Sequence, residues 1–142
     1  MYFDELKLNM RVDVQPVVIQ KEEMLSFATK YDNIPLHTDE EYAKSTHFGG
    51  LIAPGVMSFV SVWAKYLEVD FFGEELLAGK STKIEWFKPV YPKDELRATA
   101  TITNLTKRSD KNGIAEITIE VFNQKGEYVL KNVTEAIVKR KI

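Results

Sequence analysis

The 142-residue sequence contains no cysteine, and neither sign of charge dominates, with 19 lysines and arginines against 21 aspartates and glutamates. Without cysteine the chain has no disulfides, thiolate metal sites or cysteine nucleophile, which fits a reducing compartment. No block of basic residues stands out, so we expect no nucleic-acid partner. Because 44% of the residues are hydrophobic, we expect one globular domain over residues 1–142.

Long hydrophobic runs are also missing. The most apolar segment, residues 51–69, contains two serines, a lysine and a glutamate. It is therefore too polar to span a membrane and is typical of a core helix. The first seven residues include Asp4 and Glu5 and hold no long apolar run, so we expect no signal peptide. These features together predict a cytoplasmic protein that does not associate with membranes.

The first third of the chain has the periodicity of a helix. Apolar side chains recur at i, i+3, i+4 and i+7 from Met24 to Tyr31, which predicts a helix over residues 21–31. Pro35 disfavours helical backbone at Ile34. We therefore expect that helix to end near Tyr31 or Asp32, and residues 32–37 to form a rigid non-helical connection.

Two further helices are indicated. Thr38 and Glu41 have the spacing of a capping box, with Thr38 as N-cap of a short helix that continues to about Ser45. Residues 48–55 form a glycine-rich loop, and Gly55–Val69 is apolar on nearly every side. Such a helix is buried by more than one neighbour, so we expect it to lie at the centre of the fold.

The second half of the chain alternates apolar and polar residues, as half-buried strands do. An Asn112–Gly113 hairpin turn and a turn at residues 123–126 separate the last strands. Residues 10–18, with Pro16, are typical of a short edge strand. The main strands are expected within 80–90, 96–103, 115–121 and 129–139. The fold class is therefore α+β, with a curled antiparallel sheet wrapped around a central apolar helix.

Residues that suit acid–base chemistry lie between the first helices. Asp32 and His37 place a carboxylate and an imidazole five positions apart in a segment stiffened by Pro35. An imidazole exchanges protons near neutral pH. Gly55, at the start of the central helix, would present free backbone N–H groups and the positive end of the helix dipole. Taken alone, Asp32 has the plainer interpretation of a turn residue, and the glycines that of loop geometry.

The pattern Asp-x-x-Pro-[apolar]-His at 32–37, followed by Phe-Gly-Gly-Leu-Ile-Ala-Pro-Gly at 48–55, resembles the MaoC-like hydratases and dehydratases of the hot-dog fold. Both motifs have the family spacing without gaps, which favours a site over the plainer interpretation. The resemblance extends from about Glu22 to about Val138. Two positions depart from it: Ile34 replaces the Asn or Gln that usually precedes the proline, and Trp63 stands where the family's enoyl-CoA hydratases often have serine. Further matching residues are Phe27, Ala43, Phe87–Val90 and Asp94–Leu96.

The resemblance implies (R)-specific hydration of 2-enoyl-CoA thioesters and dehydration of 3-hydroxyacyl-CoA, without metal or redox cofactor. It implies that Asp32 and His37 hold and activate one water, and that the Gly55 N–H stabilises the thioester oxyanion. It also implies a homodimer or higher homo-oligomer, with the acyl-CoA substrate entering between two protomers. The expected oxyanion and substrate contacts are Gly55, Asn33, Phe48 and Trp63.

Two other functions fit parts of the sequence. A hot-dog acyl-CoA thioesterase would share the fold, although the Asp-x-x-Pro-x-His arrangement is the hydratase pattern. A non-catalytic acyl-CoA-binding protein would be consistent with the departures at Ile34 and Trp63. The residue pattern leaves open which of Asp32 and His37 is the base, the length of the acyl chain, and whether the carrier is CoA or a protein.

Overall fold

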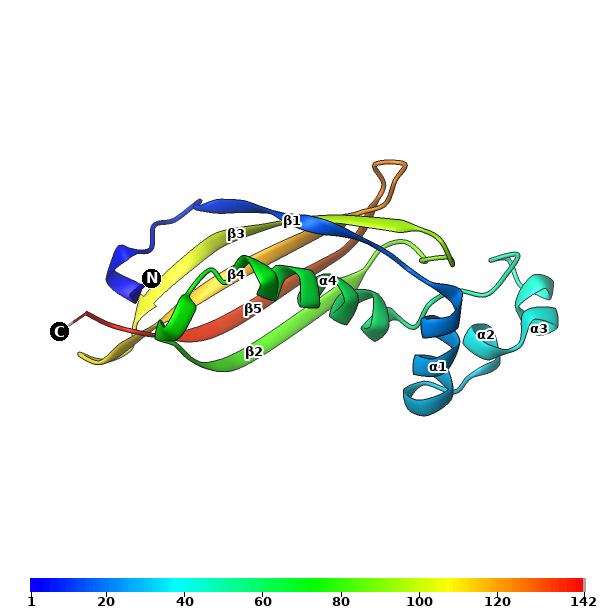
Figure 1. The fold of residues 1–142 in the computed structure, drawn as a ribbon, viewed down its shortest axis with the longest axis horizontal. Coiled ribbons are helices and arrows are strands. Elements are labelled where there is room, and N and C mark those ends of the chain that lie inside the picture. Colours follow the sequence, from blue (N-terminus) through cyan, green and yellow to red (C-terminus); the bar gives the residue numbers. More distant parts are fainter. Residues whose placement is uncertain (142) are drawn as a thin grey trace.

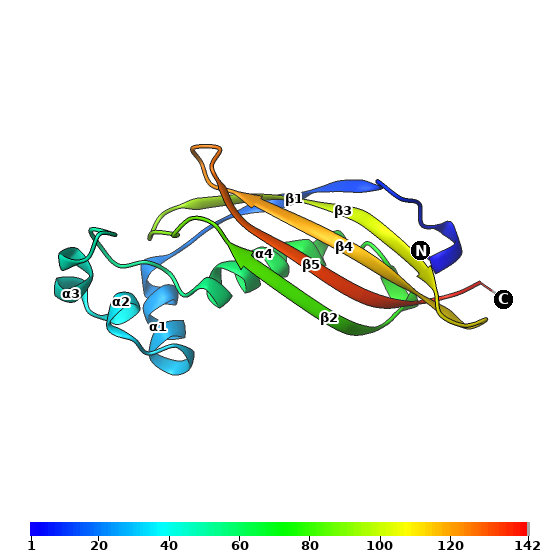
Figure 2. The ribbon, with the colours of Figure 1, turned by 180° about the vertical axis from the view of Figure 1, so that it is seen from behind.

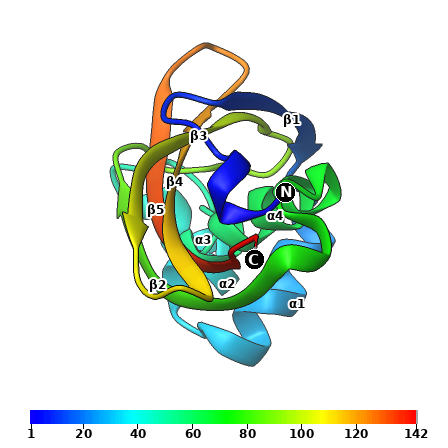
Figure 3. The same ribbon diagram turned by 90° about the vertical axis from the view of Figure 1, so that its left-hand side faces the viewer.

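The computed structural model describes residues 1–141. Within them, five antiparallel strands form one sheet in the order β1-β3-β4-β5-β2, and the long helix α4 lies along its concave face (Figures 1 and 2). Viewed end-on, the sheet curls around α4 (Figure 3). The strands are β1 (Arg11–Val18), β2 (Leu76–Trp86), β3 (Glu95–Lys107), β4 (Asn112–Phe122) and β5 (Tyr128–Lys139). The helices are α1 (Lys21–Tyr31), α2 (Pro35–Thr38), α3 (Glu40–Ser45) and α4 (Gly55–Val69), with 3-10 turns at Phe3–Glu5 and Gly73–Glu75.

The concave face of the sheet is dry. Every second residue is buried from Leu96 to Ile102 on β3 and from Gly113 to Val121 on β4. Side chains of α4, among them Met57 and Val62, belong to the same hydrophobic core. The predicted α+β architecture, a curled sheet around a central helix, is confirmed, and the central helix has the expected bounds.

Strand β1 lies at one edge of the sheet, as predicted from its proline. Its pairing with β3 shifts register between Val14 and Val17, on either side of Pro16. Because proline cannot donate to a strand ladder, an edge position with a local irregularity accommodates it.

Helices α1, α2 and α3 gather at the end of the molecule far from both termini (Figure 1). The prediction that residues 32–37 are non-helical is wrong in its second half, since Pro35 begins a single helical turn, α2, that includes His37. Proline fits the first turn of a helix because its missing N–H would have no partner there. The proline therefore ends α1 and also starts the next helix.

The N-cap of α3 is Asp39 and not Thr38. The Oδ1 atom of Asp39 accepts a hydrogen bond from the Tyr42 N–H at 3.1 Å. The hydroxyl of Thr38 instead donates to the Ile34 carbonyl at 3.0 Å, because Thr38 still belongs to α2. The predicted short helix is confirmed, with its cap one residue later than expected.

The turn between β3 and β4 also differs from the prediction. Ser109 Oγ accepts from the N–H groups of Lys111 and Asn112, and Gly113 already lies within β4. A Cβ at Gly113 would stand 2.5 Å from the ring of Phe3. That glycine therefore makes room for an aromatic ring. The turn at 123–126 is confirmed, since Gly126 has a φ of +77°.

One side of α4 has no cover within the described chain. Val56, Val60 and Leu67 are 47%, 39% and 50% exposed. Strand β2 forms the other edge of the sheet, and nearly all of its residues are exposed. The expectation that α4 is covered on almost every side is thus wrong for the single chain. Among the described residues, no helix combines the length and apolarity that a membrane crossing requires.

Candidate active site

A cleft of about 500 Å³ lies at the start of α4. It gathers four of the six residues that the sequence singled out, namely Asp32, His37, Phe48 and Gly55. The opposite wall comes from the end of β2 and the segment after it, including Trp86 and Phe87. Residues more than fifty positions apart therefore meet in one cleft.

Asp32 and His37 face each other in this cleft. Asp32 follows the last residue of α1, and its N–H donates to the Ala28 carbonyl at 2.9 Å. His37 is buried on α2, and its Nε2 lies 3.5 Å from Asp32 Oδ2. That separation exceeds the usual N–H···O range of 2.7–3.2 Å. The two side chains are thus near neighbours that a shared water can bridge.

The main chain fixes the orientation of the imidazole. His37 Nδ1 lies 2.7 Å from the Ile52 carbonyl oxygen. A carbonyl only accepts hydrogen bonds, so Nδ1 carries the hydrogen, and in the neutral ring Nε2 is left as an acceptor. The Ile52 segment is held in turn by the Ala53 N–H, which donates to the Val90 carbonyl at 2.7 Å. A backbone carbonyl carries no sequence signature, so sequence reasoning missed this partner.

Gly55 begins α4, and no side chain caps this helix end. The first N–H groups of any helix lack partners within the helix, and here no side chain takes their place. Trp86 closes one side of this helix end, because its Nε1 donates to the Gly55 carbonyl at 2.9 Å. A Cβ at position 55 would stand 2.6 Å from Trp86 Cε2. A larger residue at position 55 would therefore displace the indole from its place. Sequence reasoning missed Trp86 as a site residue, although this tryptophan lay within the strand expected over residues 80–90.

The remaining predicted residues have different settings. Phe48 lines the cleft, and its carbonyl accepts from the Tyr91 hydroxyl at 2.9 Å. Asn33 is exposed and lies outside the cleft lining, with its Oδ1 3.5 Å from Thr38 Oγ1. Trp63 is also absent from the lining and instead borders a second, separate cavity farther along α4.

Solved structures share this fold. The monoamine oxidase regulatory protein from Archaeoglobus fulgius is 26% identical, with a TM-score of 0.95 over 100% of this chain and 96% of that chain. A MaoC-like dehydratase from Rhodospirillum rubrum is 26% identical, with a TM-score of 0.87 over 100% and 99% of the two chains. The (R)-hydratase from A. caviae involved in PHA biosynthesis is 28% identical, with a TM-score of 0.74 over 96% and 98%.

The family model of the MaoC like domain matches residues 5–124. This range covers most of the chain and includes the whole segment from Asp32 to Gly55. The structural similarities extend over nearly the full length of both partners. The chain belongs to the MaoC-like family and has its hot-dog fold.

Proposed function

We propose that this protein catalyses the (R)-specific hydration of 2-enoyl-CoA thioesters and the reverse dehydration of 3-hydroxyacyl-CoA, with residues 1–142 as one catalytic domain. The observation that carries the proposal is the pairing of Asp32 Oδ2 with His37 Nε2, 3.5 Å apart, in a cleft that also contains the start of α4. Membership of the MaoC-like family and the likeness to an (R)-hydratase support it.

The pair acts on water. With Nδ1–H engaged by the Ile52 carbonyl, His37 Nε2 and the Asp32 carboxylate are both acceptors that face one point. A water placed there donates one O–H to each and directs its lone pair at C3 of the enoyl group. The pair takes one proton from the water as the C3–O bond forms and returns one proton to C2. The addition is balanced, and no oxidant or reductant is needed.

The start of α4 would stabilise the charge that develops on the thioester oxygen. That oxygen becomes enolate-like as water attacks, and the free N–H groups at Gly55 provide donors and the positive end of the helix dipole. Donors of this kind, fixed before the reaction, each account for roughly 10²–10³ in kcat. The two motifs thus divide the work, with proton transfer at 32–37 and charge stabilisation at Gly55.

We propose further that the working form is a homodimer and that acyl-CoA enters at its interface. The uncovered side of α4 carries exposed Val56, Val60 and Leu67, and the neighbouring edge strand β2 offers unpaired backbone groups. Exposed apolar surface beside a free strand edge fits a second copy that adds its own β2 by two-fold symmetry. Because β2 ends at Trp86 in the cleft, such a dimer would place the site at the interface. A cytoplasmic location is part of the same proposal.

The test is a panel of enoyl-CoAs with short, medium and branched chains. Hydration removes the conjugated double bond, so absorbance of the enoyl thioester should fall when crotonyl-CoA or a longer homologue is mixed with the protein. No absorbance loss with any member, for protein that unfolds cooperatively, would refute the proposal. Release of free thiol from saturated acyl-CoA would indicate a thioesterase. Binding of acyl-CoA in calorimetry, with no turnover of any substrate, would indicate a non-catalytic binding protein. Light scattering that gives a monomer's mass would refute the dimer.

A further inference from the structure

Ser58 is a buried residue of the cleft that the proposed proton transfer leaves unused. It follows Gly55 by three residues on α4, is 1% exposed, and lines the same cleft. Residues three apart share a face of a helix. A helical side chain also leans toward the turn before its own Cα, so the Ser58 side chain covers the turn that begins at Gly55. The hydroxyl therefore lies beside the proposed oxyanion site.

The hydroxyl of Ser58 is only loosely held. Its Oγ lies 3.4 Å from the Pro54 carbonyl oxygen, beyond the range of about 2.5–3.0 Å for an ordinary O–H···O hydrogen bond. The same carbonyl already accepts the Ser58 N–H at 3.1 Å. When the hydroxyl turns to another acceptor, the Pro54 carbonyl keeps its backbone partner. Redirecting the O–H thus costs little, because it leaves no buried carbonyl unpaired.

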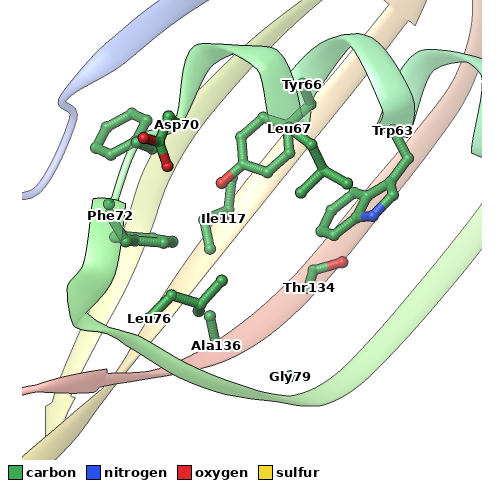
Figure 4. Close-up of a pocket in the computed structure, with 12 residues that line it drawn as sticks. Trp63, Tyr66, Leu67, Asp70, Phe72, Leu76, Gly79, Ile117, Thr134 and Ala136 are labelled. Carbon is green, nitrogen blue, oxygen red and sulfur yellow. The ribbon is translucent and has the colours of Figure 1, made fainter.

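The other hydroxyls of α4 are placed differently. The Oγ of Ser61 donates to the Met57 carbonyl at 2.8 Å, a fully formed bond of the same kind between a side chain and the carbonyl four residues before it. The phenol of Tyr66 points, with Trp63, into the separate cavity of about 90 Å³ beside β5 (Figure 4). Of the three hydroxyls on α4, all within the described residues, that of Ser58 alone belongs to a residue of the cleft lining.

The setting of the imidazole argues against a serine nucleophile. In a Ser-His-Asp relay the carboxylate and the hydroxyl engage opposite nitrogens of the ring. Here His37 Nδ1 lies 2.7 Å from the Ile52 carbonyl oxygen, and Asp32 Oδ2 lies 3.5 Å from Nε2. The carboxylate thus occupies the side of the ring that a serine nucleophile would need. The Ser58 hydroxyl is then left to act as a hydrogen-bond donor that keeps its own proton.

We propose that Ser58 is a further catalytic residue, whose hydroxyl donates a hydrogen bond to the thioester carbonyl oxygen of the substrate. This inference rests on the proposed function, with that oxygen at the start of α4. The N–H groups at Gly55 point along the helix axis, and the Ser58 hydroxyl reaches the same oxygen from the side. A hydrogen bond to a charged oxygen is roughly twice as strong as one to a neutral oxygen. The contact therefore strengthens as the oxygen becomes enolate-like, and it raises kcat more than it tightens substrate binding.

Ser58→Ala and Ser61→Ala form a matched pair. Each removes one hydroxyl from α4 and introduces alanine, which favours helix. Ser61→Ala loses the shorter hydrogen bond, so its free energy of unfolding should be no higher than that of Ser58→Ala. The order of activity should be the reverse. With crotonyl-CoA, Ser58→Ala should lose roughly 10–10²-fold in kcat while KM stays within about threefold of wild type, and Ser61→Ala should keep wild-type kinetics.

A second measurement detects the contact without turnover. A hydrogen bond to a carbonyl oxygen weakens the C=O bond and lowers its stretching frequency. The probe is butyryl-CoA, a saturated thioester that cannot be hydrated, with a carbon-13 label at the carbonyl to identify its infrared band. The band of the bound thioester should lie at higher frequency in Ser58→Ala than in wild type, and it should not move in Ser61→Ala.

Failure of this inference is separable from failure of the proposed function. If wild type hydrates enoyl-CoA but Ser58→Ala keeps kcat within about twofold, or loses kcat without a shift of the band, the donor role is overturned and the hydratase stands. An acyl-enzyme that accumulates in wild type and not in Ser58→Ala would make Ser58 a nucleophile and also overturn it. If no enoyl-CoA is hydrated, the proposed function fails and the infrared band decides. A shift confined to Ser58→Ala supports the contact, whereas identical bands, or no bound butyryl-CoA, overturn it.

Discussion

Replacing Gly55 by alanine isolates the proposed oxyanion site from the acid–base pair. The added methyl would lie 2.6 Å from Trp86 Cε2 and 2.7 Å from Nε1, so the indole has to move. Trp86 is 47% exposed and can turn toward solvent. The displacement breaks its hydrogen bond to the Gly55 carbonyl, and the net worth of such a bond is about 0.5–1.5 kcal/mol.

Two opposing terms set the stability of Gly55→Ala. Alanine favours helix over glycine by up to about 1 kcal/mol, which offsets most of the lost hydrogen bond. We expect the free energy of unfolding to change by less than about 1 kcal/mol, a shift in Tm of a few degrees. Activity should change far more, because the methyl occupies the approach to the N–H groups at the start of α4. Loss of one oxyanion donor corresponds to roughly 10²–10³ in kcat.

The assay combines thermal unfolding with kcat and KM for enoyl-CoA hydration in four proteins: wild type, Gly55→Ala, Trp86→Ala and the double variant. The double variant removes the clash, so the cycle separates displacement of the indole from obstruction at position 55. We expect no rescue in the double variant. If Gly55→Ala keeps activity within about threefold of wild type, or if the double variant recovers it, the assignment of Gly55 is refuted.

Three other predictions test local features. Burial raises the pKa of Tyr66 to about 12 from its ordinary value near 10. Above pH 10 the unfolded chain therefore loses a proton that the folded chain keeps. The free energy of unfolding falls as a result while the pH rises toward 12. Tyr66→Phe should weaken that fall by up to about 1.4 kcal/mol per pH unit in denaturant titrations, and an unchanged pH dependence would contradict this. Gly113→Ala should lower the free energy of unfolding by ~1–3 kcal/mol, because the added methyl would stand 2.5 Å from the Phe3 ring. Adding Phe3→Leu to this variant should restore part of the lost stability. An unaltered Tm in Gly113→Ala would disprove the contact. Because Asp39 caps α3, Asp39→Ala should lower the free energy of unfolding by about 1 kcal/mol, and by more than Thr38→Ala does. If urea unfolding shows the larger loss for Thr38→Ala, Thr38 is the cap after all.

The sequence predicted those parts of the fold that local pattern determines. The bounds of α4 follow from a glycine at its start and an unbroken apolar run. The alternation on β3 and β4 correctly identified their buried faces. The pairing of Asp32 with His37 is also short-range, since one residue ends α1 and the other lies on the next helical turn.

Features that depend on distant contacts were missed or misread. Pro35 is compatible both with the end of one helix and with the start of another, and only the following turn decides between them. Gly113 fits a hairpin turn until Phe3, far away in sequence, is seen to need the space. The Ile52 carbonyl that orients His37, and the indole of Trp86 over Gly55, arise only when separate segments meet. Trp63 was expected at the site because it stands where the family often has serine, yet it lies about two turns beyond the start of α4 and borders a different cavity.

The most direct test of the central claim is the hydration rate of Asp32→Asn. The amide keeps the shape of the side chain beside His37 Nε2 but removes the charge and one acceptor. If Asp32 and His37 share a catalytic water, kcat should fall by roughly 10²–10⁴, while calorimetric affinity for a saturated acyl-CoA stays near that of wild type. Hydration at the wild-type rate by Asp32→Asn, with the fold intact, would contradict the account.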